Sequence, residues 1–472
     1  MGGTHEFNVT VTGKSKVAAT LPIQEHWLPL SNLDLLLPPL NVHVIFCYKK
    51  AENEETDFKQ KVSVLKKGLA QALVSFYAFA GELVNNSAGE PEILCNNRGV
   101  DFIEAFAEVK LRDLQLYDPA QCFEAKLVPL KGDGVLSVQV TKLECGAITI
   151  GCTFDHRVAD AYSANMFWVT WSEMTTSKPI TTHPCFRRSL LNPKRPLMHD
   201  ISLDDMYVPI STLTRQNEPK TMIDSDPLIS RIYNISADQL RRLQCLASNC
   251  SLDCCKGSFM RSKLQSFSAF LWKLVASHAY HFEPDTNGSG FCKMGIVVDG
   301  RTRLSDGEGK DKLTRLFSYF GNVLSIPFGE QKCGDLTNMS LDCVTNKVHN
   351  FLNQATSKDH FLGLIDWVEA HKPEPLVAKI YSNKTEDGPA FVVSSGQRFP
   401  ISKVDFGWGK PGFGSYHFPW GGNCGYVMPM PSPLGNGDWV VYMHLRESQL
   451  DFIQKKACGV IELVNSNLVG LA

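Results

Sequence analysis

Apolar and polar positions alternate or cluster in distinct ways over the first 185 residues. Residues 7–21 begin with alternating valine and threonine, a pattern typical of an edge strand. The segments 42–48 and 147–154 are almost continuously apolar and predict buried strands. From Phe58 to Leu83, apolar side chains recur at helical spacing, which predicts an amphipathic helix that ends at Gly81. Further strands are predicted at 92–94, 99–103 and 135–142, and a further helix at 159–174.

The pattern weakens between residues 186 and 228. This segment contains several prolines and acidic residues without clear periodicity, which predicts an interdomain linker. Ser236 and Gln239 then have the spacing of a helix capping box. Beyond the linker we predict strands at 231–235, 295–298 and 439–445, and helices at 236–247, 262–279 and 450–458. Both halves mix the two kinds of element, so each is predicted to be an α/β or α+β unit.

Length and composition fit two large domains rather than a disordered or membrane-spanning chain. The chain has 472 residues, 43% of them apolar and 20% charged. Its 47 basic and 49 acidic residues give a net charge of −2, so the basic excess of a nucleic-acid-binding protein is missing. The first residues, MGGTHEFNV, match neither a signal peptide nor a myristoylation site, and no apolar stretch has the length of a membrane span. We therefore expect a cytoplasmic protein that binds neither nucleic acid nor membrane.

The cysteines indicate neither a metal site nor a disulfide framework. There are 15 of them, an odd number, and they are scattered from Cys47 to Cys458. No pair is spaced like the ligands of a structural zinc site. In a reducing compartment such residues are mostly small buried apolar side chains. We expect no metal.

The most specific candidate for chemistry is His156, followed four residues later by Asp160. His156 comes at the end of a predicted buried strand, where its imidazole can project into a cleft and abstract a proton near neutral pH. Asp160 stands near the start of the next helix, where a carboxylate caps free N–H groups. His281 and Asp285 have the same spacing but lie in a polar loop, so we interpret His281 as a surface residue. The alternative for His156 is a histidine whose hydrogen bonds are satisfied in the core.

A second motif, Asp405-Phe-Gly-Trp-Gly409, lies about 250 residues further on. Gly407, Gly409 and Gly412 formally match a dinucleotide-binding glycine motif, but Pro411 interrupts it and no helix can follow. We therefore predict a tight structural turn in which Trp408 is packed and Asp405 is paired to a buried cation.

Several basic residues are candidates for pairing or for anion binding. Arg301 or Arg303 leaves a predicted strand and can pair with Asp160 or Asp405 through a bidentate contact; the alternative is a solvated loop. Arg261, Ser262 and Lys263 stand at the start of a predicted helix, where cationic groups and free N–H groups favour a phosphate; the alternative is an ordinary exposed helix face. The chain has no G-x-S-x-G elbow, Walker A loop, H-E-x-x-H or EF-hand loop, which disfavours a serine hydrolase, a P-loop NTPase and a zincin.

Taken together, these motifs resemble those of the plant BAHD family of acyl-CoA-dependent acyltransferases, nearly from end to end. The family has a His-x3-Asp and an Asp-Phe-Gly-Trp-Gly at these places. Smaller similarities follow in the same order: Leu30–Asp34 (LSNLD), the FYAFAGEL stretch ending near Leu83, Cys95 to Ala105, VDGRTR at 298–303 and YFGN at 319–322.

The resemblance implies a fold of two chloramphenicol-acetyltransferase-like domains with mixed sheets and an active-site channel between them. Residues 1–205 would form the N-terminal domain with His156, 206–228 a crossover loop, and 229–472 the C-terminal domain with the Asp405 turn. Acyl-CoA would be a co-substrate, a small hydroxylated molecule the acceptor, and no cofactor would be required. By the same analogy we expect a monomer.

The resemblance also implies roles for individual residues. His156 would be the general base, and Ser394 or Ser395 would donate a hydrogen bond to the tetrahedral oxyanion. Asp160 would turn away from the substrate and pair with an arginine. The Asp405 turn, with Gly407, Trp408 and Gly409, would be structural and lie off the active site.

Details of the sequence point to one branch of the family. Many members have a tryptophan where this chain has Gly396, which predicts a wider or reshaped acceptor side. Residues 372–391 contain no arginine, which disfavours an acceptor such as shikimate. The runs LPIQEHWLPLSNLDLLLPP and VVSSGQRFP look most like the coniferyl alcohol acyltransferase branch, which implies an acetyl donor and a phenylpropanoid alcohol acceptor. The alternatives are a hydroxycinnamoyl or benzoyl donor, another alcohol or an amine as acceptor, or a non-catalytic binding protein.

Overall fold

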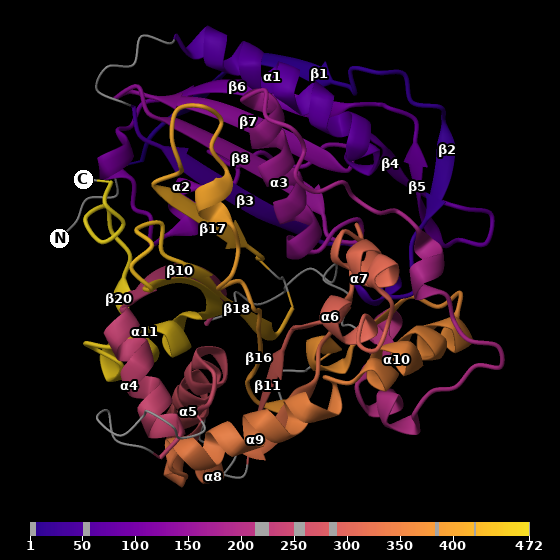
Figure 1. The fold of residues 1–472 in the computed structure, drawn as a ribbon. Coiled ribbons are helices and arrows are strands. Elements are labelled where there is room, and N and C mark those ends of the chain that lie inside the picture. The colour runs from indigo at the N-terminus through magenta and orange to yellow at the C-terminus, as the bar shows by residue number, and fades with distance from the viewer. Residues whose placement is uncertain are drawn as a thin grey trace.

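Two mixed β-sheets, both covered by helices, form the framework of the protein (Figure 1). The structure is a computed structural model, and it describes residues 6–50, 57–212, 226–249, 260–282, 290–382, 387–419 and 422–471. The first sheet has the order β1 (Val9–Val17), β6 (Val100–Ala107), β7 (Leu136–Leu143), β8 (Ile148–Asp155), β3 (Asn41–Tyr48) and β17 (Phe413–His417). The second has the order β14 (Phe328–Lys332), β11 (Phe291–Ile296), β16 (Ala390–Val393), β18 (Cys424–Pro431), β19 (Trp439–Arg446), β10 (Leu228–Ile235) and β20 (Glu462–Leu463). The predicted fold class, an α/β protein with mixed sheets, is confirmed.

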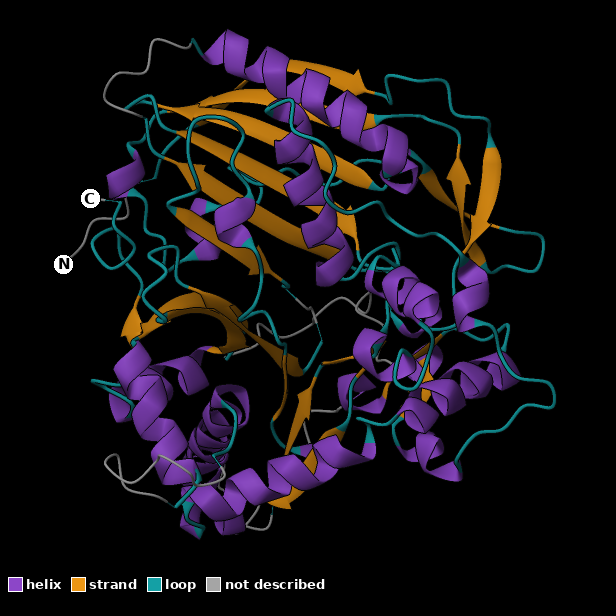
Figure 2. Cartoon of the chain, viewed as in Figure 1, coloured by secondary structure: helices purple, strands orange, loops and turns teal. Residues whose placement is uncertain are grey.

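Two helices cover one face of the first sheet, as Figure 2 shows: α1 (Phe58–Ser75) and α3 (Ala161–Thr175). Leu65 and Leu69 of α1 and Trp168 of α3 are buried between helix and sheet. The helices meet closely at Gly68, where a Cβ atom would lie 2.2 Å from the Thr175 hydroxyl oxygen. The apolar face that predicted α1 is therefore the face that packs against the sheet and α3.

The helix predicted to run to Gly81 is too long. It ends at Ser75, a short 3₁₀ turn (Tyr77–Ala80) follows, and β4 (Glu82–Asn85) then begins. The apolar spacing continues past the helix because Phe76 and Phe79 still fill the core from the turn, each with its ring about 5 Å from that of Phe167. Apolar periodicity marks buried side chains, and in this segment the buried side chains continue beyond the end of the helix.

Five helices cover the second sheet: α4 (Ala237–Ala247), α5 (Lys263–Phe282), α8 (Cys333–Asn338), α9 (Leu341–Gln354) and α11 (Glu447–Lys456). The Ser236 hydroxyl caps α4 by accepting a hydrogen bond from the N–H of Gln239 at 3.2 Å. The Gln239 side chain donates to the Gly459 carbonyl instead of closing the predicted capping box.

The remaining elements are short or lie outside the two sheets. They are β2 (His26–Pro29), β5 (Pro91–Cys95), β9 (Tyr207–Pro209), β12 (Val298–Asp299), β13 (Leu324–Ser325), β15 (Leu376–Ala378), α2 (Pro119–Cys122), α6 (Arg301–Leu304), α7 (Lys310–Phe317) and α10 (Lys358–His371). The predicted crossover loop, 206–228, contains β9, which pairs with β15, and the first residue of β10. Its residues 213–225 lie outside the described part of the chain.

One strand crosses between the predicted domains. β17 belongs to the predicted C-terminal domain, 229–472, yet it pairs antiparallel with β3 and forms an edge of the first sheet. Figure 1 shows it as a gold arrow beside the indigo and purple strands. Phe413 and Tyr416 of β17 are buried there. A boundary in the sequence therefore does not assign every strand to its sheet, and the predicted division into domains stays a prediction.

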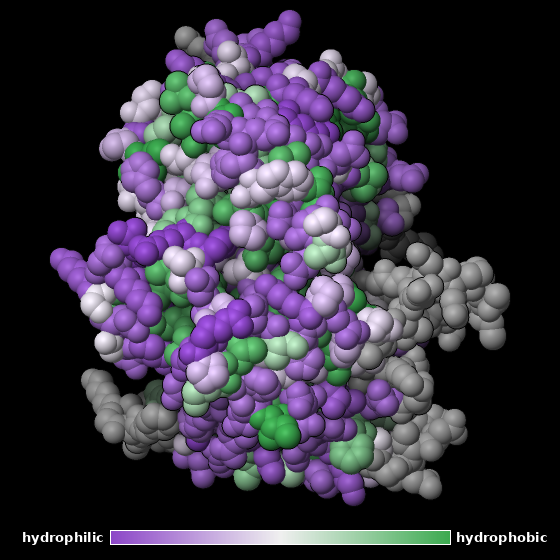
Figure 3. Space-filling view, turned by 90° about the vertical axis from the view of Figure 1, so that its right-hand side faces the viewer, coloured by the Kyte–Doolittle hydropathy of each residue, from purple (hydrophilic) through white to green (hydrophobic). Residues whose placement is uncertain are grey.

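Two apolar cores accompany the two sheets, and the larger one extends into the junction between them. The face seen in Figure 3 carries mostly hydrophilic side chains, with hydrophobic ones scattered among them. No helix in the described ranges combines the length and the apolar character that crossing a bilayer requires.

The tight packing of β8 generates a first testable prediction. A Cβ atom at Gly151 would lie 2.1 Å from the Leu127 carbonyl oxygen, and the backbone there cannot easily move. We expect Gly151→Ala to lower the free energy of unfolding by about 1–3 kcal/mol, the usual range for overpacking. The melting temperature of the purified variant checks this.

Gly363→Ala is the matched control. Gly363 lies inside α10, and the nearest atom to its Cβ position is 3.7 Å away. Alanine favours a helix over glycine by about 1 kcal/mol, so this variant should melt at or above the wild-type temperature. A Gly151→Ala variant that melts like the wild type would contradict the packing described for β8.

Candidate active site

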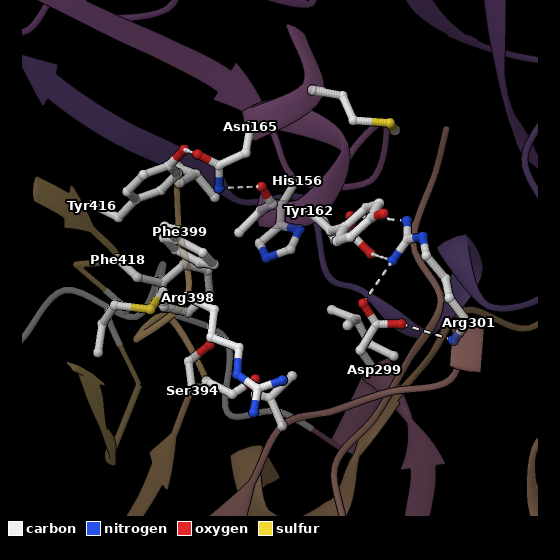
Figure 4. A pocket seen from close by; sticks show the side chains of 18 of the residues that line it. His156, Tyr162, Asn165, Asp299, Arg301, Ser394, Arg398, Phe399, Tyr416 and Phe418 are labelled. Atoms are coloured by element: carbon white, nitrogen blue, oxygen red, sulfur yellow. Dashed lines mark hydrogen bonds and ion pairs between the residues drawn. The ribbon is translucent and has the colours of Figure 1, made fainter. Parts of the chain in front are cut away.

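A cavity of about 660 Å³ lies where the two sheets meet (Figure 4). His156 and Asn165 line it from the first half of the chain, and Ser394, Phe418 and Tyr426 line it from the second half. Its volume is in the range of about 300–1,000 Å³ that is common for small-molecule sites. His156 from the first half of the chain and the candidate serines from the second half therefore line the same cavity.

His156 projects into this cavity from the end of β8, as Figure 4 shows. Its backbone N–H donates to the Leu40 carbonyl at 2.8 Å, which fixes the chain as it leaves the strand. The ring edge meets Phe418, with the two ring centroids 5.8 Å apart and the planes at 89°. Nδ1 is buried and has no hydrogen-bond partner among the described residues. The ring therefore enters the cavity without a hydrogen bond that holds it at Nδ1.

Burial keeps the His156 imidazole neutral. Removal from water lowers its pKa below the ordinary 6.5, because the charged form loses its hydration. The backbone of His156 itself, and then the carboxylates of Asp160 and Asp155, oppose this shift without reversing it. Both carboxylates are already paired, Asp155 by a bidentate contact from Arg157 at 2.8 and 3.0 Å. A neutral imidazole can accept a proton, which is what a general base must do.

Asp160 forms a buried ion pair with Arg301 in place of a catalytic contact. Arg301 donates to its two carboxylate oxygens at 2.7 and 3.1 Å, and both side chains are 1% exposed. The same carboxylate accepts the N–H of Ser163, as the predicted helix cap, and that of Val323. Both oxygens are thus occupied, so Asp160 serves the architecture of the loop.

Arg301 links three segments of the chain. Besides Asp160 it donates to the carboxylate of Asp299 at 3.1 Å, to the Ser163 hydroxyl, and to the carbonyls of Tyr319 and Gly321. The sequence left Arg301 and Arg303 as equal candidates for pairing with an aspartate. The structure selects Arg301, whereas Arg303 is exposed.

A second network holds the backbone of His156. The Asn322 side chain donates to the His156 carbonyl at 2.9 Å and to the Asp34 carboxylate at 2.9 Å. The Asn322 N–H also donates to Asp34, at 2.6 Å, and Ser31 donates to the other oxygen of Asp34. Asp34 and Asn322 were visible in the sequence only as parts of short family similarities, LSNLD and YFGN. Their function in positioning the histidine loop could not be read from spacing.

The two candidate serines lie on the cavity wall. Ser394 and Ser395 directly follow β16, and both line the cavity. The N–H of Ser394 donates to the Val427 carbonyl on the neighbouring strand β18 at 2.8 Å. The serine hydroxyl groups and the neutral imidazole of His156 therefore line the same cavity.

Gly396 reshapes the wall without opening it. A Cβ atom there would lie 2.7 Å from the Met428 sulfur and 2.7 Å from the Pro429 carbonyl oxygen. Phe399 also approaches, at 3.1 Å. The space that a larger side chain at 396 would enter is therefore filled by Met428 and Phe399, so the widening considered from the sequence is not found at this point.

The candidate phosphate residues lie outside the cavity. Arg261, Ser262 and Lys263 are not among the residues that line it. The Arg261 guanidinium donates to the Asn346 side chain on α9, and Ser262 accepts the N–H of Gln265 at the start of α5. Nothing in these contacts identifies a ligand.

The turn at 405–409 is built differently from the sequence prediction. Asp405 accepts the N–H groups of Gly407 and Gly409 at 2.8 and 2.9 Å, and among the described residues no cation forms an ion pair with it. Gly407 and Gly409 have φ values of +107° and +100°, which favour glycine. Trp408 packs against Tyr48 as predicted. None of these turn residues lines the cavity.

Two cationic side chains on the cavity wall, Arg398 and Lys403, were not among the candidates from the sequence. Arg398 lines the cavity and is labelled in Figure 4, and no ion pair to it is found in the described ranges. The absence of arginine from residues 372–391 disfavoured a carboxylated acceptor, but Arg398 lies beyond that segment and places a positive charge on the cavity wall. In the same described ranges, no cluster of three or more His, Cys, Asp or Glu side chains could hold a metal ion.

Known proteins resemble this chain over nearly its full length. Residues 7–458 match a family described as the Transferase family. Shikimate O-hydroxycinnamoyltransferase from Nicotiana tabacum is 27% identical over 455 residues, which are 93% of this chain and 96% of that protein. Rosmarinate synthase from Plectranthus scutellarioides is also 27% identical, with the same two coverages.

Solved structures share the fold. Vinorine synthase superposes with a TM-score of 0.70 at 18% identity, covering 97% of this chain and all of that one. F. graminearum TRI101, complexed with coenzyme A and T-2 mycotoxin, gives a TM-score of 0.71 at 15% identity and covers 93% of this chain and 99% of its own. At these identities the likeness supports the two-sheet architecture and says nothing about substrates.

The buried ion pair provides the second prediction. Asp160→Ala leaves the Arg301 guanidinium buried without its main partner, so we expect the free energy of unfolding to fall by about 3–5 kcal/mol. The double variant Asp160→Ala/Arg301→Met also removes the charge of Arg301, and it should recover part of that loss. Melting temperatures of the wild type, Asp160→Ala, Arg301→Met and the double variant compare these cases. A double variant that loses the sum of the two single losses would refute the pairing.

Proposed function

This chain belongs to the Transferase family of acyl-CoA-dependent acyltransferases, and from that membership we propose that it acetylates a phenylpropanoid alcohol such as coniferyl alcohol, with acetyl-CoA as donor. The observation that carries the proposed chemistry is His156, whose half-buried imidazole is kept neutral inside a ligand-sized cavity. The identity of the substrates rests on the resemblance of the chain to the coniferyl alcohol branch.

In the proposed reaction, His156 is the general base. Its Nε2 takes the proton of the acceptor hydroxyl while that oxygen attacks the thioester carbonyl carbon of acyl-CoA. A tetrahedral intermediate forms with one new carbon–oxygen bond. The carbon–sulfur bond then breaks, the CoA thiolate leaves, and the imidazolium returns its proton to the sulfur. The products are the ester and CoA, and no acyl-enzyme forms.

The negative charge of the intermediate requires a hydrogen-bond donor. Ser394 and Ser395 supply hydroxyl groups on the wall of the same cavity, and we assign one of them to the carbonyl oxygen. Asp160 and Arg301 take no part in bond making, because their charges are satisfied by each other. They hold the loop that carries the base. For the phosphates of CoA, Arg261, Ser262 and Lys263 remain our candidates.

The lining of the cavity is consistent with an aromatic acceptor. Phe399 and Phe418 contribute rings, and Met166 and Met428 contribute flexible apolar side chains. Aromatic faces bind aromatic ligands by offset or edge-to-face contacts. The wall also offers the hydroxyl groups that a phenolic alcohol can bond.

An aromatic acyl donor is the second candidate. Similar proteins include hydroxycinnamoyl- and benzoyltransferases, among them an anthranilate N-benzoyltransferase of Dianthus caryophyllus, which is 26% identical over 456 residues. The cavity volume of about 660 Å³ leaves space for such a donor. A thiol-release assay with acetyl-CoA and with aromatic acyl-CoA donors therefore distinguishes the two candidates.

The third prediction is that loss of His156 stops CoA release. Purified protein is given acetyl-, p-coumaroyl- or benzoyl-CoA with coniferyl alcohol, a simple alcohol, an amine or shikimate, and free thiol is measured. We expect release from acetyl-CoA with coniferyl alcohol, and a rate about 10²–10⁴-fold lower for His156→Ala, the usual contribution of a general base.

His281→Ala is the control, since His281 is exposed near the end of α5 and outside the cavity. Release with another donor or acceptor would keep the mechanism and replace the substrates. If no combination releases thiol, or if His156→Ala is as active as the wild type, the proposed chemistry is wrong and a non-catalytic binding protein becomes the better hypothesis.

The fourth prediction concerns pH. Only the neutral imidazole can act as the base, and burial lowers the pKa of His156 below 6.5. Protonation should therefore reduce kcat/KM only as the pH falls below 6.5, with a plateau above it. Melting temperatures at each pH separate this effect from unfolding. If kcat/KM reaches half of its plateau only at a pH above 6.5, another titrating group or the charged form of His156 controls the rate.

A further inference from the structure

A second histidine, His417, lines the same cavity from the end of β17. It is fully buried, and it directly precedes Phe418, whose ring meets that of His156 with the two centroids 5.8 Å apart. The reaction described above gives His417 no role. Ligand sites are mostly apolar and carry a few well-placed polar groups that orient the ligand, so this buried imidazole is a candidate for such a group.

Three contacts fix the position of the His417 ring. It stacks on Phe123, with centroids 5.4 Å apart and planes at 24°, and on Tyr442, with centroids 5.1 Å apart and planes at 28°. Its Nε2 lies 2.9 Å from the Ser415 hydroxyl oxygen. The plane of the ring and its rotation are therefore set before any ligand binds.

Ser415 determines which ring nitrogen carries the proton. It is fully buried, and among the described residues its hydroxyl has a hydrogen bond only with Nε2 of His417. A buried hydroxyl proton without an acceptor is costly, so Ser415 donates to Nε2. Burial, reinforced by the neighbouring His43, lowers the pKa of His417 to about 3, so the ring is neutral at physiological pH. A neutral ring that accepts at Nε2 carries its proton at Nδ1.

The Nδ1–H group of His417 is therefore a buried donor, and in the described part of the chain no acceptor pairs with it. Buried polar groups are almost always paired, so an unpaired donor on a residue that lines a ligand-sized cavity points to a partner on the ligand. His43, opposite His417 in the strand pair, also has an unpaired Nδ1, but it does not line the cavity. The two histidines thus differ in their access to a ligand.

We propose that His417 recognises a second oxygen of the acceptor: its Nδ1–H donates to a phenolic oxygen on the acceptor ring, while the reacting hydroxyl meets His156 and the ring packs on Phe418. This inference rests on the proposed function, because it takes an aromatic alcohol as the acceptor. It narrows the substrate class to alcohols that carry an oxygen on the ring. An analogue without that oxygen would leave the Nδ1–H group unpaired and be disfavoured.

The test compares p-coumaryl alcohol with cinnamyl alcohol, which lacks only the phenolic hydroxyl. The readout is the ratio of the two kcat/KM values in the thiol-release assay, because a general loss of activity cancels in that ratio. We expect the wild type to prefer p-coumaryl alcohol by at least about tenfold, the effect of leaving one buried donor unpaired.

Two substitutions of His417 separate its nitrogens. The amide of His417→Gln reaches the place of Nε2 and keeps the Ser415 contact, whereas the amide of His417→Asn lies near the place of Nδ1. We expect the ratio to fall to about one in His417→Gln and to be largely retained in His417→Asn. Ser415→Ala removes a single oxygen and frees the ring proton to occupy either nitrogen, so it should lower the ratio partly even if the His417 variants do not fold.

His43→Gln is the matched control, since it changes the cross-strand neighbour of His417 outside the cavity, and it should keep the wild-type ratio. Melting temperatures identify variants with a fold defect. Calorimetric titration of the full-length protein with the two alcohols, without a donor, gives the ratio of their Kd values and applies the same test without catalysis.

The inference is overturned by a wild-type ratio near one, by a wild-type ratio in a folded His417→Gln, or by an equal fall of the ratio in His43→Gln. Thiol release that requires His156, with a ratio insensitive to His417, would leave the proposed function intact and refute only the role of His417. A Kd ratio that depends on His417, without any thiol release, would do the reverse. A protein that neither binds nor acylates the two alcohols would refute both.

Discussion

The fully buried pair of Asp160 and Arg301 is the constraint on which the site depends. Each ion loses several kcal/mol of hydration free energy on burial, and only well-placed partners compensate for that loss. Arg301 finds them in a helix cap, a strand exit and two carbonyls of the loop at 319–321. Segments 141 residues apart must therefore be in place together. A half-formed version of this arrangement would leave a bare charge in the protein interior.

The requirement that each buried charge has a partner also explains how His156 stays neutral between two carboxylates. Asp155 and Asp160 flank the histidine, and free carboxylates there would raise the pKa of His156 and favour its charged form. Arg157 and Arg301 neutralise one each. The loop is then held from the other side by Asn322 on the His156 carbonyl. Electrostatics and position are thus set by different groups, which allows the imidazole itself to stay unpaired at Nδ1.

Local chemistry in the sequence predicted the centre of the site, and long-range packing supplied the rest. His156 and Asp160 are four residues apart on a strand-to-helix turn, so a pattern could find them. The arginine that pairs with Asp160 could be narrowed to Arg301 or Arg303, but the sequence could not distinguish between these two residues. Phe418, Tyr426 and Arg398 had no signal, because each depends on which strand lies beside which. The overlong helix at 58–83 and the cation expected at Asp405 failed for a related reason: apolar spacing does not mark a helix end, and backbone N–H groups can satisfy a carboxylate as well as a cation can.

The strand that crosses between the sheets has a consequence for synthesis on the ribosome. β3 and β8 are complete once residue 155 has been made, but the edge of β3 is covered only by residues 413–417. For most of translation, that edge exposes unpaired backbone N–H and C=O groups. Such edges are where nascent chains join one another, so the emerging protein is expected to need a chaperone until residue 417 has been made. Because β17 is the last strand of the first sheet, the sheet that leads to His156 is completed only near the end of synthesis.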